Sequence, residues 1–247
     1  MYRALLLSLA ACGRVGFDVA TDATIGGDGP AADGSALTPL HRYRFENNLL
    51  DDFGGPPLVP LSPGTFNANG YKFPLNVGLT LPVGSGFPAG AYTVRMVFVF
   101  DTVTSWRKIL DFDGGALDRG LYVYESALQH VIVPNGGATP DFETSRAMFA
   151  PGIVTGVTIT RNPAGHVAGY IDELPIGAER SGTNTVPQNP SGSFDFDDPA
   201  GTARLNAALA RWFVDDSDTG GSEASSGTVR QISLWDRALT AGEVAQL

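Results

Sequence analysis

The clearest pattern along this chain is a strict alternation of large apolar side chains between residues 91 and 100. The residues at every second position are Tyr92, Val94, Met96, Phe98 and Phe100. Because successive side chains of a strand point to opposite faces, this period of two predicts a β-strand that turns one face into a core.

Further segments alternate in the same way, and Gly, Pro, Asn or Asp clusters separate most of them, as expected of a sandwich or barrel. These predicted strands are 41–46, 106–112, 120–124, 128–133, 154–160, 166–171, 210–214 and 228–235. Pro163 and Gly165 mark a turn between two of them, so we predict an antiparallel hairpin over 154–171. Residues 184–198 are rich in turn-forming side chains and predict a long loop.

The C-terminal segment Leu239–Leu247 is the one predicted helix. Thr240 and Glu243 have the spacing of a capping box, in which the threonine hydroxyl accepts a backbone N–H and the glutamate reaches back. We therefore expect an all-β, antiparallel sandwich with one short C-terminal helix over its end.

The N-terminus carries the chain's single cysteine, Cys12, directly after Leu9, Ala10 and Ala11. A short charged start, an apolar run and small residues before Cys are typical of a bacterial lipoprotein signal, here 1–11, with the Cys12 thiol taking the lipid. The run is far shorter than the roughly 20 residues needed to span a bilayer. The alternative is a frayed terminus. The position after Cys12 is Gly13, whereas in many bacteria an Asp at this position retains lipoproteins at the inner membrane. By resemblance, this implies the outer membrane of the cell envelope.

Residues 12–37 are small and acidic, with few large apolar side chains, and predict a flexible Gly/Ala/Asp tether because they bury too little surface to offset the entropy of ordering. The folded domain is then expected over 38–247.

The composition of the chain limits the classes of binding partner that we expect. The net charge is −10 and the chain has only two lysines, Lys72 and Lys108, so nucleic-acid binding is disfavoured. Membrane contact is expected through the lipid alone. An acidic surface is compatible with divalent cations, neutral glycans or basic protein partners.

Three segments together resemble a known family. They are YRFENNLLDDFGG (43–55), VTGVTITRNPAGHVAGYIDE (154–173) and GTVRQISLWDRALTAGEVAQL (227–247). They resemble the opening strand, the central hairpin and the last strand with terminal helix of laminin-G-like domains, which are concanavalin A-like jelly rolls. The resemblance implies two antiparallel sheets packed face to face with Greek-key connections.

The lectin and glucanase superfamily to which such jelly rolls belong includes laminarinase-type enzymes, so catalysis has to be considered. Those enzymes carry Glu-x-Asp-x-x-Glu on one strand, which places two carboxylates at a glycosidic bond. Asp111 and Asp113 have the two-residue spacing but no following glutamate. Asp172 and Glu173 are adjacent and face opposite ways, and the acids at 195–198 lie in the turn-rich stretch. We therefore predict no catalytic residues; the alternatives are a glycoside hydrolase with a different motif and a purely structural envelope component.

Calcium is the predicted cofactor. Asp215, Asp216, Asp218 and Glu223 form an acidic loop, and calcium takes about six to eight oxygen ligands from such loops. The resemblance adds Glu46, because relatives carry a calcium near the junction of the first and last strands. Where relatives place an Asp early in the last strand, this chain has Arg230. The alternatives are therefore an internal salt bridge from Arg230 to Glu46 or Asp215, and a solvated acidic loop.

An exposed aromatic ring is the candidate for ligand contact. Trp106 sits near a strand start beside Arg107 and Lys108, so we expect it to be exposed and to stack on a sugar; the alternative is that it caps the core edge. Trp235 is expected in the core. The sequence thus predicts a non-catalytic, lipid-anchored envelope protein that binds a carbohydrate or another surface protein.

Overall fold

The computed structural model describes residues 37–82, 89–125, 127–132, 142–143, 149–171, 174–175, 195–206 and 209–247. All of them belong to one unit, Leu37–Leu247. The predicted signal, Cys12 and the tether as far as residue 36 lie outside the described residues.

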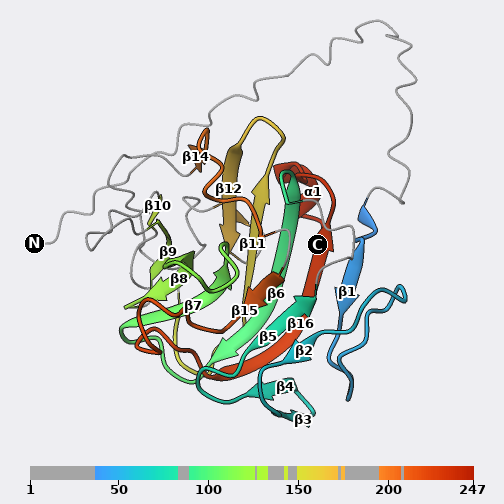
Figure 1. Ribbon diagram of the computed structural model, residues 1–247. Helices are drawn as coiled ribbons and strands as arrows, with labels where there is room; N and C mark the ends of the chain where they lie inside the picture. Colours follow the sequence, from blue (N-terminus) through green and yellow to red (C-terminus); the bar gives the residue numbers. More distant parts are fainter. Residues whose placement is uncertain are drawn as a thin grey trace, which may run out of the picture. The chain divides into compact units, whose positions relative to one another are not determined.

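The alternating segments form two antiparallel sheets of a β-sandwich, which confirms the predicted fold class (Figure 1). Sheet A contains β1 (His41–Tyr43), β3 (Thr65–Asn67), β4 (Gly70–Phe73), β6 (Tyr92–Phe100), β11 (Thr155–Arg161), β12 (His166–Ile171), β13 (Leu174–Pro175), β14 (Asp195–Asp197) and β16 (Gly227–Trp235). Sheet B contains β2 (Val59–Pro60), β5 (Leu79–Pro82), β7 (Trp106–Asp111), β8 (Arg119–Tyr124), β9 (Ala127–Ile132), β10 (Phe142–Glu143) and β15 (Leu209–Trp212).

Long-range pairing builds both sheets. Sheet A runs β13-β12-β11-β6-β16-β4-β3, with β1 also paired to β16 and β14 to β12. Sheet B runs β10-β9-β8-β7-β15-β5-β2. The long strands β6 and β16 lie side by side in Figure 1, with Val94 opposite Leu234 and Phe100 opposite Gly227. The last strand thereby holds the middle of sheet A together.

The core lies between the sheets, where the alternating residues of β6 meet the inner face of sheet B. All five predicted inward residues of β6 are buried in it. Sheet B contributes Ile109, Leu121, Val123 and Trp212, each without exposed surface. Because Leu121 and Val123 face the core, Tyr122 and Tyr124 of the same strand lie on the outer face of sheet B.

The predicted hairpin over 154–171 is confirmed as β11 and β12, which pair antiparallel around a turn in which Gly165 adopts a φ of +95°. The predicted helix is confirmed in a shorter form, α1 (Ala241–Val244), with both hydrogen bonds of the Thr240–Glu243 capping box. Val244 of this helix is buried in a small cluster with Trp235 and Leu239. Among the described residues, no helix is long and apolar enough to cross a membrane.

Two sequence predictions differ from the structure. Residues 195–197 of the predicted loop form β14, which pairs with β12; residues 184–194 lie outside the described part. Between residues 58 and 82 the chain forms four short strands, β2 to β5, that the sequence did not indicate. They hold two to four residues each, too few for a period to stand out among their Gly, Pro and Asn neighbours.

Candidate functional site: a buried carboxylate cluster and an aromatic pair

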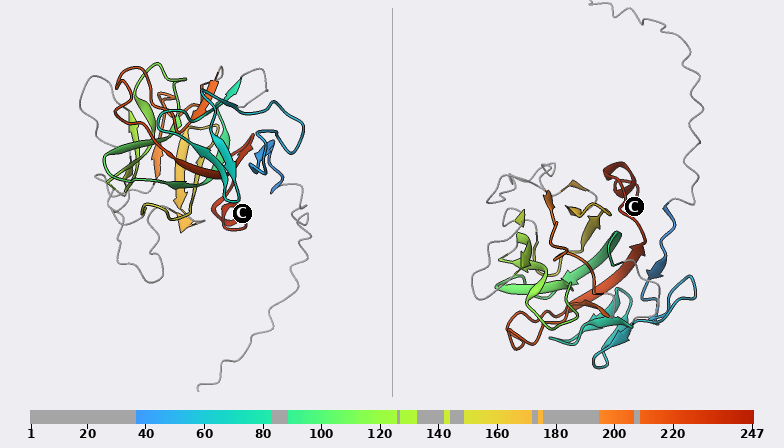
Figure 2. Two further views of the ribbon diagram at one scale, coloured as in Figure 1. Left: turned by 90° about the horizontal axis from the view of Figure 1, so that it is seen from below. Right: turned by 45° about the horizontal axis from the view of Figure 1, so that its top comes forward.

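The acidic loop, residues 213–226, connects β15 to β16 and lies beside β7. Phe213 N donates to Ile109 O at 3.0 Å, and Lys108 N donates to Glu223 O at 3.1 Å. Ser217 N bonds Gly115 O, in the β7–β8 connection, at 3.1 Å. In Figures 1 and 2 the acidic loop, in red, runs beside the green β7–β8 hairpin. The loop therefore covers side chains that leave the outer face of sheet B.

Lys108 is the first of these covered side chains, and it is fully buried. Lys108 is opposite Tyr122 in the strand register, so its side chain leaves the outer face of sheet B, on the side away from the core-facing Ile109. The ammonium pairs with Asp216 and lies 5.1 Å from the centre of the Tyr122 ring. It is also 3.3 Å from Asp111, 3.8 Å from Asp118 and 4.0 Å from Asp215. One cation thus lies among four carboxylates in a site closed to solvent.

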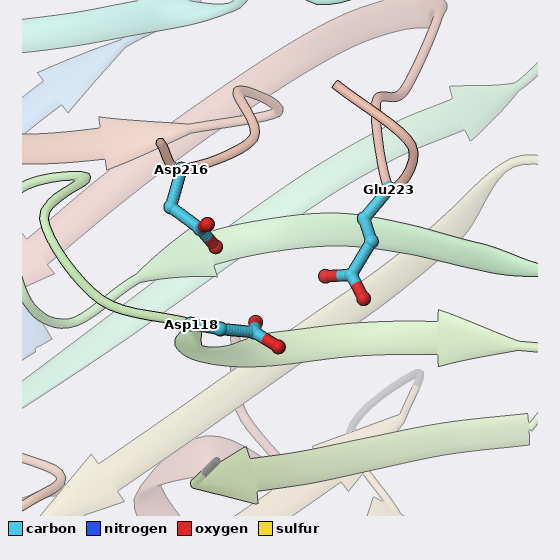
Figure 3. A group of neighbouring side chains, drawn as sticks. All are labelled: Asp118, Asp216 and Glu223. Atoms are coloured by element: carbon cyan, nitrogen blue, oxygen red, sulfur yellow. The ribbon is translucent and has the colours of Figure 1, made fainter. Parts of the chain in front are cut away.

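Three acids converge beside this lysine: Asp118, Asp216 and Glu223 (Figure 3). Each offers a carboxylate oxygen, and these oxygens lie within 4.8 Å of one another. Asp118 precedes β8 and accepts a hydrogen bond from Tyr122 Oη. Glu223 is 8% exposed, and its buried Oε2 has no hydrogen-bond partner among the described residues.

The electrostatics of the three acids differ. Burial, followed by the negative charges of the neighbouring Asp118 and Asp215, raises the pKa of Glu223 to about 8. Burial also raises the pKa of Asp118. Burial opposes ionisation of Asp216 too, but the Lys108 ammonium and the N–H groups of Thr219 and Asp218 together outweigh that effect and lower its pKa. Lys108 therefore stabilises the ionised form of Asp216 most, whereas burial and the neighbouring carboxylates disfavour ionisation of the other two acids.

Asp215 and Asp218 have other surroundings. Asp215 accepts hydrogen bonds from Glu223 N at 3.1 Å and Thr219 Oγ1 at 2.8 Å, so it ties the two ends of the acidic loop together. Asp218 is exposed, and only its backbone N–H bonds Asp216 Oδ1, at 2.8 Å. The structure thus brings Asp216 and Glu223 together, sets Asp215 beside Lys108 and leaves Asp218 in solvent.

Glu46 lies apart from this cluster. Its side chain is 67% exposed and sits 3.4 Å from Arg44. It lines a surface pocket of about 400 Å³ together with Arg230, whose Nη2 donates to Asn69 Oδ1 at 3.1 Å. Sequence reasoning missed Asp118, which joins the cluster instead of Glu46. Asp118 is placed there by Tyr122, which bonds it and is opposite Lys108 in the strand register, and the sequence alone does not show that pairing.

Trp106 is half-buried at the start of β7. Its ring stacks on Tyr124 with centroids 4.2 Å apart at 29°, and it meets Tyr122 edge to face at 5.5 Å. Trp106 is opposite Tyr124 in the strand register, so this aromatic pair belongs to the outer face of sheet B. Since Tyr122 also bonds Asp118, the pair and the carboxylate cluster are connected through one ring.

Asp111 and Asp113 are the described acids with the two-residue spacing considered for catalysis, and each has other contacts. Asp111 is buried and accepts hydrogen bonds from the N–H groups of Asp113 and Gly115, which closes the turn after β7. Asp113 is half-buried and lies 3.9 Å from Arg119. Asp172 and Glu173, and the side chain of Asp195, lie outside the described residues.

Comparison with known proteins gives the fold. No family model and no curated protein matches the sequence. The chain is similar in structure to domain 4 of AbnA, a GH43 extracellular arabinanase from Geobacillus stearothermophilus in complex with arabinotriose; the TM-score is 0.53 at 15% identity, over 85% of this chain and 97% of that one.

Two further solved structures share the fold. A Trypanosoma rangeli sialidase in complex with sialic acid matches with a TM-score of 0.54 at 16% identity, over 83% of this chain and 31% of the sialidase. A botulinum neurotoxin serotype D binding domain matches with a TM-score of 0.56 at 12% identity, over 85% of this chain and 51% of that domain. The chain thus spans about a third of the sialidase and half of the toxin domain. At these identities the likeness is one of β-sandwich architecture.

Proposed function

We propose that this domain is a non-catalytic carbohydrate-binding module whose contact surface is the outer face of sheet B. The observation that carries the proposal is the stacked pair of Trp106 and Tyr124, half-buried on that face beside the carboxylate cluster. Tryptophan and tyrosine combine a broad apolar ring with a polar edge, which suits a sugar's apolar face and hydroxyl rim.

The charge of the site selects among sugars. Asp118, Asp216 and Glu223 lie beyond Tyr122, and the whole chain carries a net charge of −10. An acidic surface repels anionic sugars and leaves neutral ones unaffected. The bound arabinotriose of the arabinanase domain is a neutral sugar of this kind. We therefore propose a neutral oligosaccharide as the ligand.

Burial supports a binding role over hydrolysis. Asp118, Asp216 and Glu223 are each less than a tenth exposed. Glycosidase carboxylates must reach both sides of a glycosidic bond, so they need an open cleft. The family resemblance and the lipid tether at Cys12 stay predictions from the sequence; with them, the module would present its sugar site close to a bacterial envelope.

The test is a titration of the purified full chain with neutral oligosaccharides by calorimetry, after a glycan array has selected the sugar. We expect Trp106→Ala to weaken binding at least tenfold. Phe53→Ala is the matched control, because Phe53 is an exposed aromatic elsewhere on the domain, and we expect less than a twofold change.

Two outcomes contradict the proposal. An equal loss of sugar affinity in both variants would show that the contact surface is not the outer face of sheet B. Release of reducing ends from the bound glycan, abolished by Glu223→Gln, would favour a glycoside hydrolase instead.

A further inference from the structure

The carboxylate cluster carries more negative charge than its own cations balance. Asp111, Asp118, Asp215 and Asp216 surround the Lys108 ammonium, and Glu223 is the fifth acid. Lys108 and Arg211, whose guanidinium bonds Gly114 O and Asp215 O, supply two positive charges against these five. Buried carboxylates in such excess must take up protons or a cation, because charge without a counter-ion is strongly disfavoured away from water.

The position of this excess is defined by the hydrogen bonds. The Lys108 ammonium binds Asp216, and the N–H groups of Glu223 and Asp216 bind Asp215. Gly115 N–H binds Asp111. Glu223 Oε2, by contrast, is buried and has no partner among the described residues, and Figure 3 shows its carboxylate directed toward Asp118 and Asp216. Asp118 and Asp216 accept hydrogen bonds from Tyr122, from Lys108 and from backbone N–H groups of the acidic loop, so Glu223 Oε2 is the buried oxygen of this group that lacks a partner among the described residues. The point at which it faces Asp118 and Asp216 is therefore where negative charge is left without a donor.

We propose that this point is a calcium site formed by Asp118, Asp216 and Glu223. Calcium binds oxygen ligands at about 2.4 Å, so ligands on opposite sides of the ion are about 4.8 Å apart. The three carboxylate oxygens lie within 4.8 Å of one another, so they fit around one such ion. The set contains no His or Cys, which favours a hard cation over zinc or copper.

The site also has a consequence for the acidic loop. Asp118 belongs to the β7–β8 connection, whereas Asp216 and Glu223 belong to the two ends of the loop between β15 and β16. An ion shared by all three would fasten the loop to the outer face of sheet B, beside Tyr122 and the aromatic pair. The ion is therefore expected to stabilise the folded domain as well as to bind.

The experiment uses the full chain, freed of metal with a chelator and titrated with calcium chloride by calorimetry. We expect one calcium ion per chain. Glu223→Gln removes a ligand charge but keeps the shape of a protonated Glu223, so the variant is expected to fold and to lose at least tenfold in affinity. Asp218→Asn is the matched control, since it removes one negative charge from the same loop at an exposed position outside the cluster. It should change the affinity less than twofold.

A second readout is independent of the variants. Terbium replaces calcium in oxygen sites, and Tyr122, whose hydroxyl bonds Asp118, would sensitise its luminescence. We expect emission on excitation of the aromatic residues, displaced by calcium. No heat and no sensitised emission in the wild-type chain overturns the proposal. Equal losses in Glu223→Gln and Asp218→Asn, or no loss in either, also overturn it. If Glu223→Gln does not fold, Asp118→Asn replaces it with the same expectation.

Discussion

At the scale of single residues, Lys108 shows how one side chain takes its role from distant parts of the chain. Lysine is almost never fully buried unless it is paired. Here the acidic loop supplies Asp216 and the β7–β8 connection supplies Asp118, and together they replace the water that the ammonium loses. The pairing is a condition of the burial, because a lone ammonium would be strongly disfavoured in this environment.

Replacing Lys108 tests this dependence. Lys108→Met keeps the side-chain length but leaves its carboxylates without their nearest cation. We expect the free energy of unfolding in urea to fall by about 3–5 kcal/mol, as when one partner of a buried ion pair is removed. Lys72→Met is the control, because the Lys72–Asp101 pair is exposed and worth at most about 1 kcal/mol. Similar losses in both variants would show that the buried charge has no special weight.

At the scale of elements, a buried aspartate holds the turn after β14 against β11. Asp198 accepts hydrogen bonds from Thr202 N and Ala203 N, at 2.7 and 3.0 Å. It also pairs with the buried Arg161 of β11 at 3.0 Å. Burial by itself would raise the pKa of Asp198, but the bonds from Thr202, Ala203 and Arg161 outweigh it, and the pKa is lowered. The ionised carboxylate is thus the form that the fold prefers.

The direction of this shift sets a pH dependence. Because the folded-state pKa lies below the ordinary value of 3.8, the stabilisation is present above pH 3.8 and is lost as the pH falls through the folded-state value. We expect Asp198→Asn to be less stable than the wild type at pH 7, and we expect the difference in stability to narrow as the pH falls below 3.8. Urea unfolding from pH 7 to pH 2 measures it. Asp197→Asn is the control, since that side chain is 85% exposed. A constant difference across the range would contradict this account of Asp198.

At the scale of the whole molecule, aromatic packing joins the two sheets. Phe213 directly follows β15 of sheet B and reaches across to sheet A. Its ring stacks on Phe73 of β4 at 4.5 Å and lies 5.3 Å from Phe98 of β6. Phe213 has a φ of +60°, which residues other than glycine adopt rarely, so the packing of its ring outweighs an unfavourable backbone conformation.

Removing this ring tests how far it links the sheets. We expect Phe213→Ala to lower the free energy of unfolding by about 3–5 kcal/mol, through lost burial and the cavity that remains. Thermal or urea unfolding followed by circular dichroism measures the change. Leu75→Ala is the control, because Leu75 is 60% exposed, and its effect should stay within about 0.5 kcal/mol. Equal effects would mean that the sheets do not depend on this contact.

The sequence by itself determined the features that depend on neighbouring residues. The alternation in 92–100 specified a strand and its inward face, because the period of a strand is local. Pro163 and Gly165 specified the turn of the β11–β12 hairpin, and Thr240 with Glu243 specified the start of α1, for the same reason. The sequence pattern did not predict the short strands β2 to β5, because each depends on pairing with a partner strand more than on its own pattern.

Only the tertiary structure decided the site. Asp118 joins Asp216 and Glu223 because β7 lies between β8 and β15, a pairing that no local pattern encodes. Glu46 and Asp218 carry the same chemistry in the sequence, yet one lines a separate pocket and the other faces solvent. Whether carboxylates can bind an ion or a sugar depends on the distances between their oxygens and on how deeply they are buried. Both follow from how strands far apart in the chain are brought side by side.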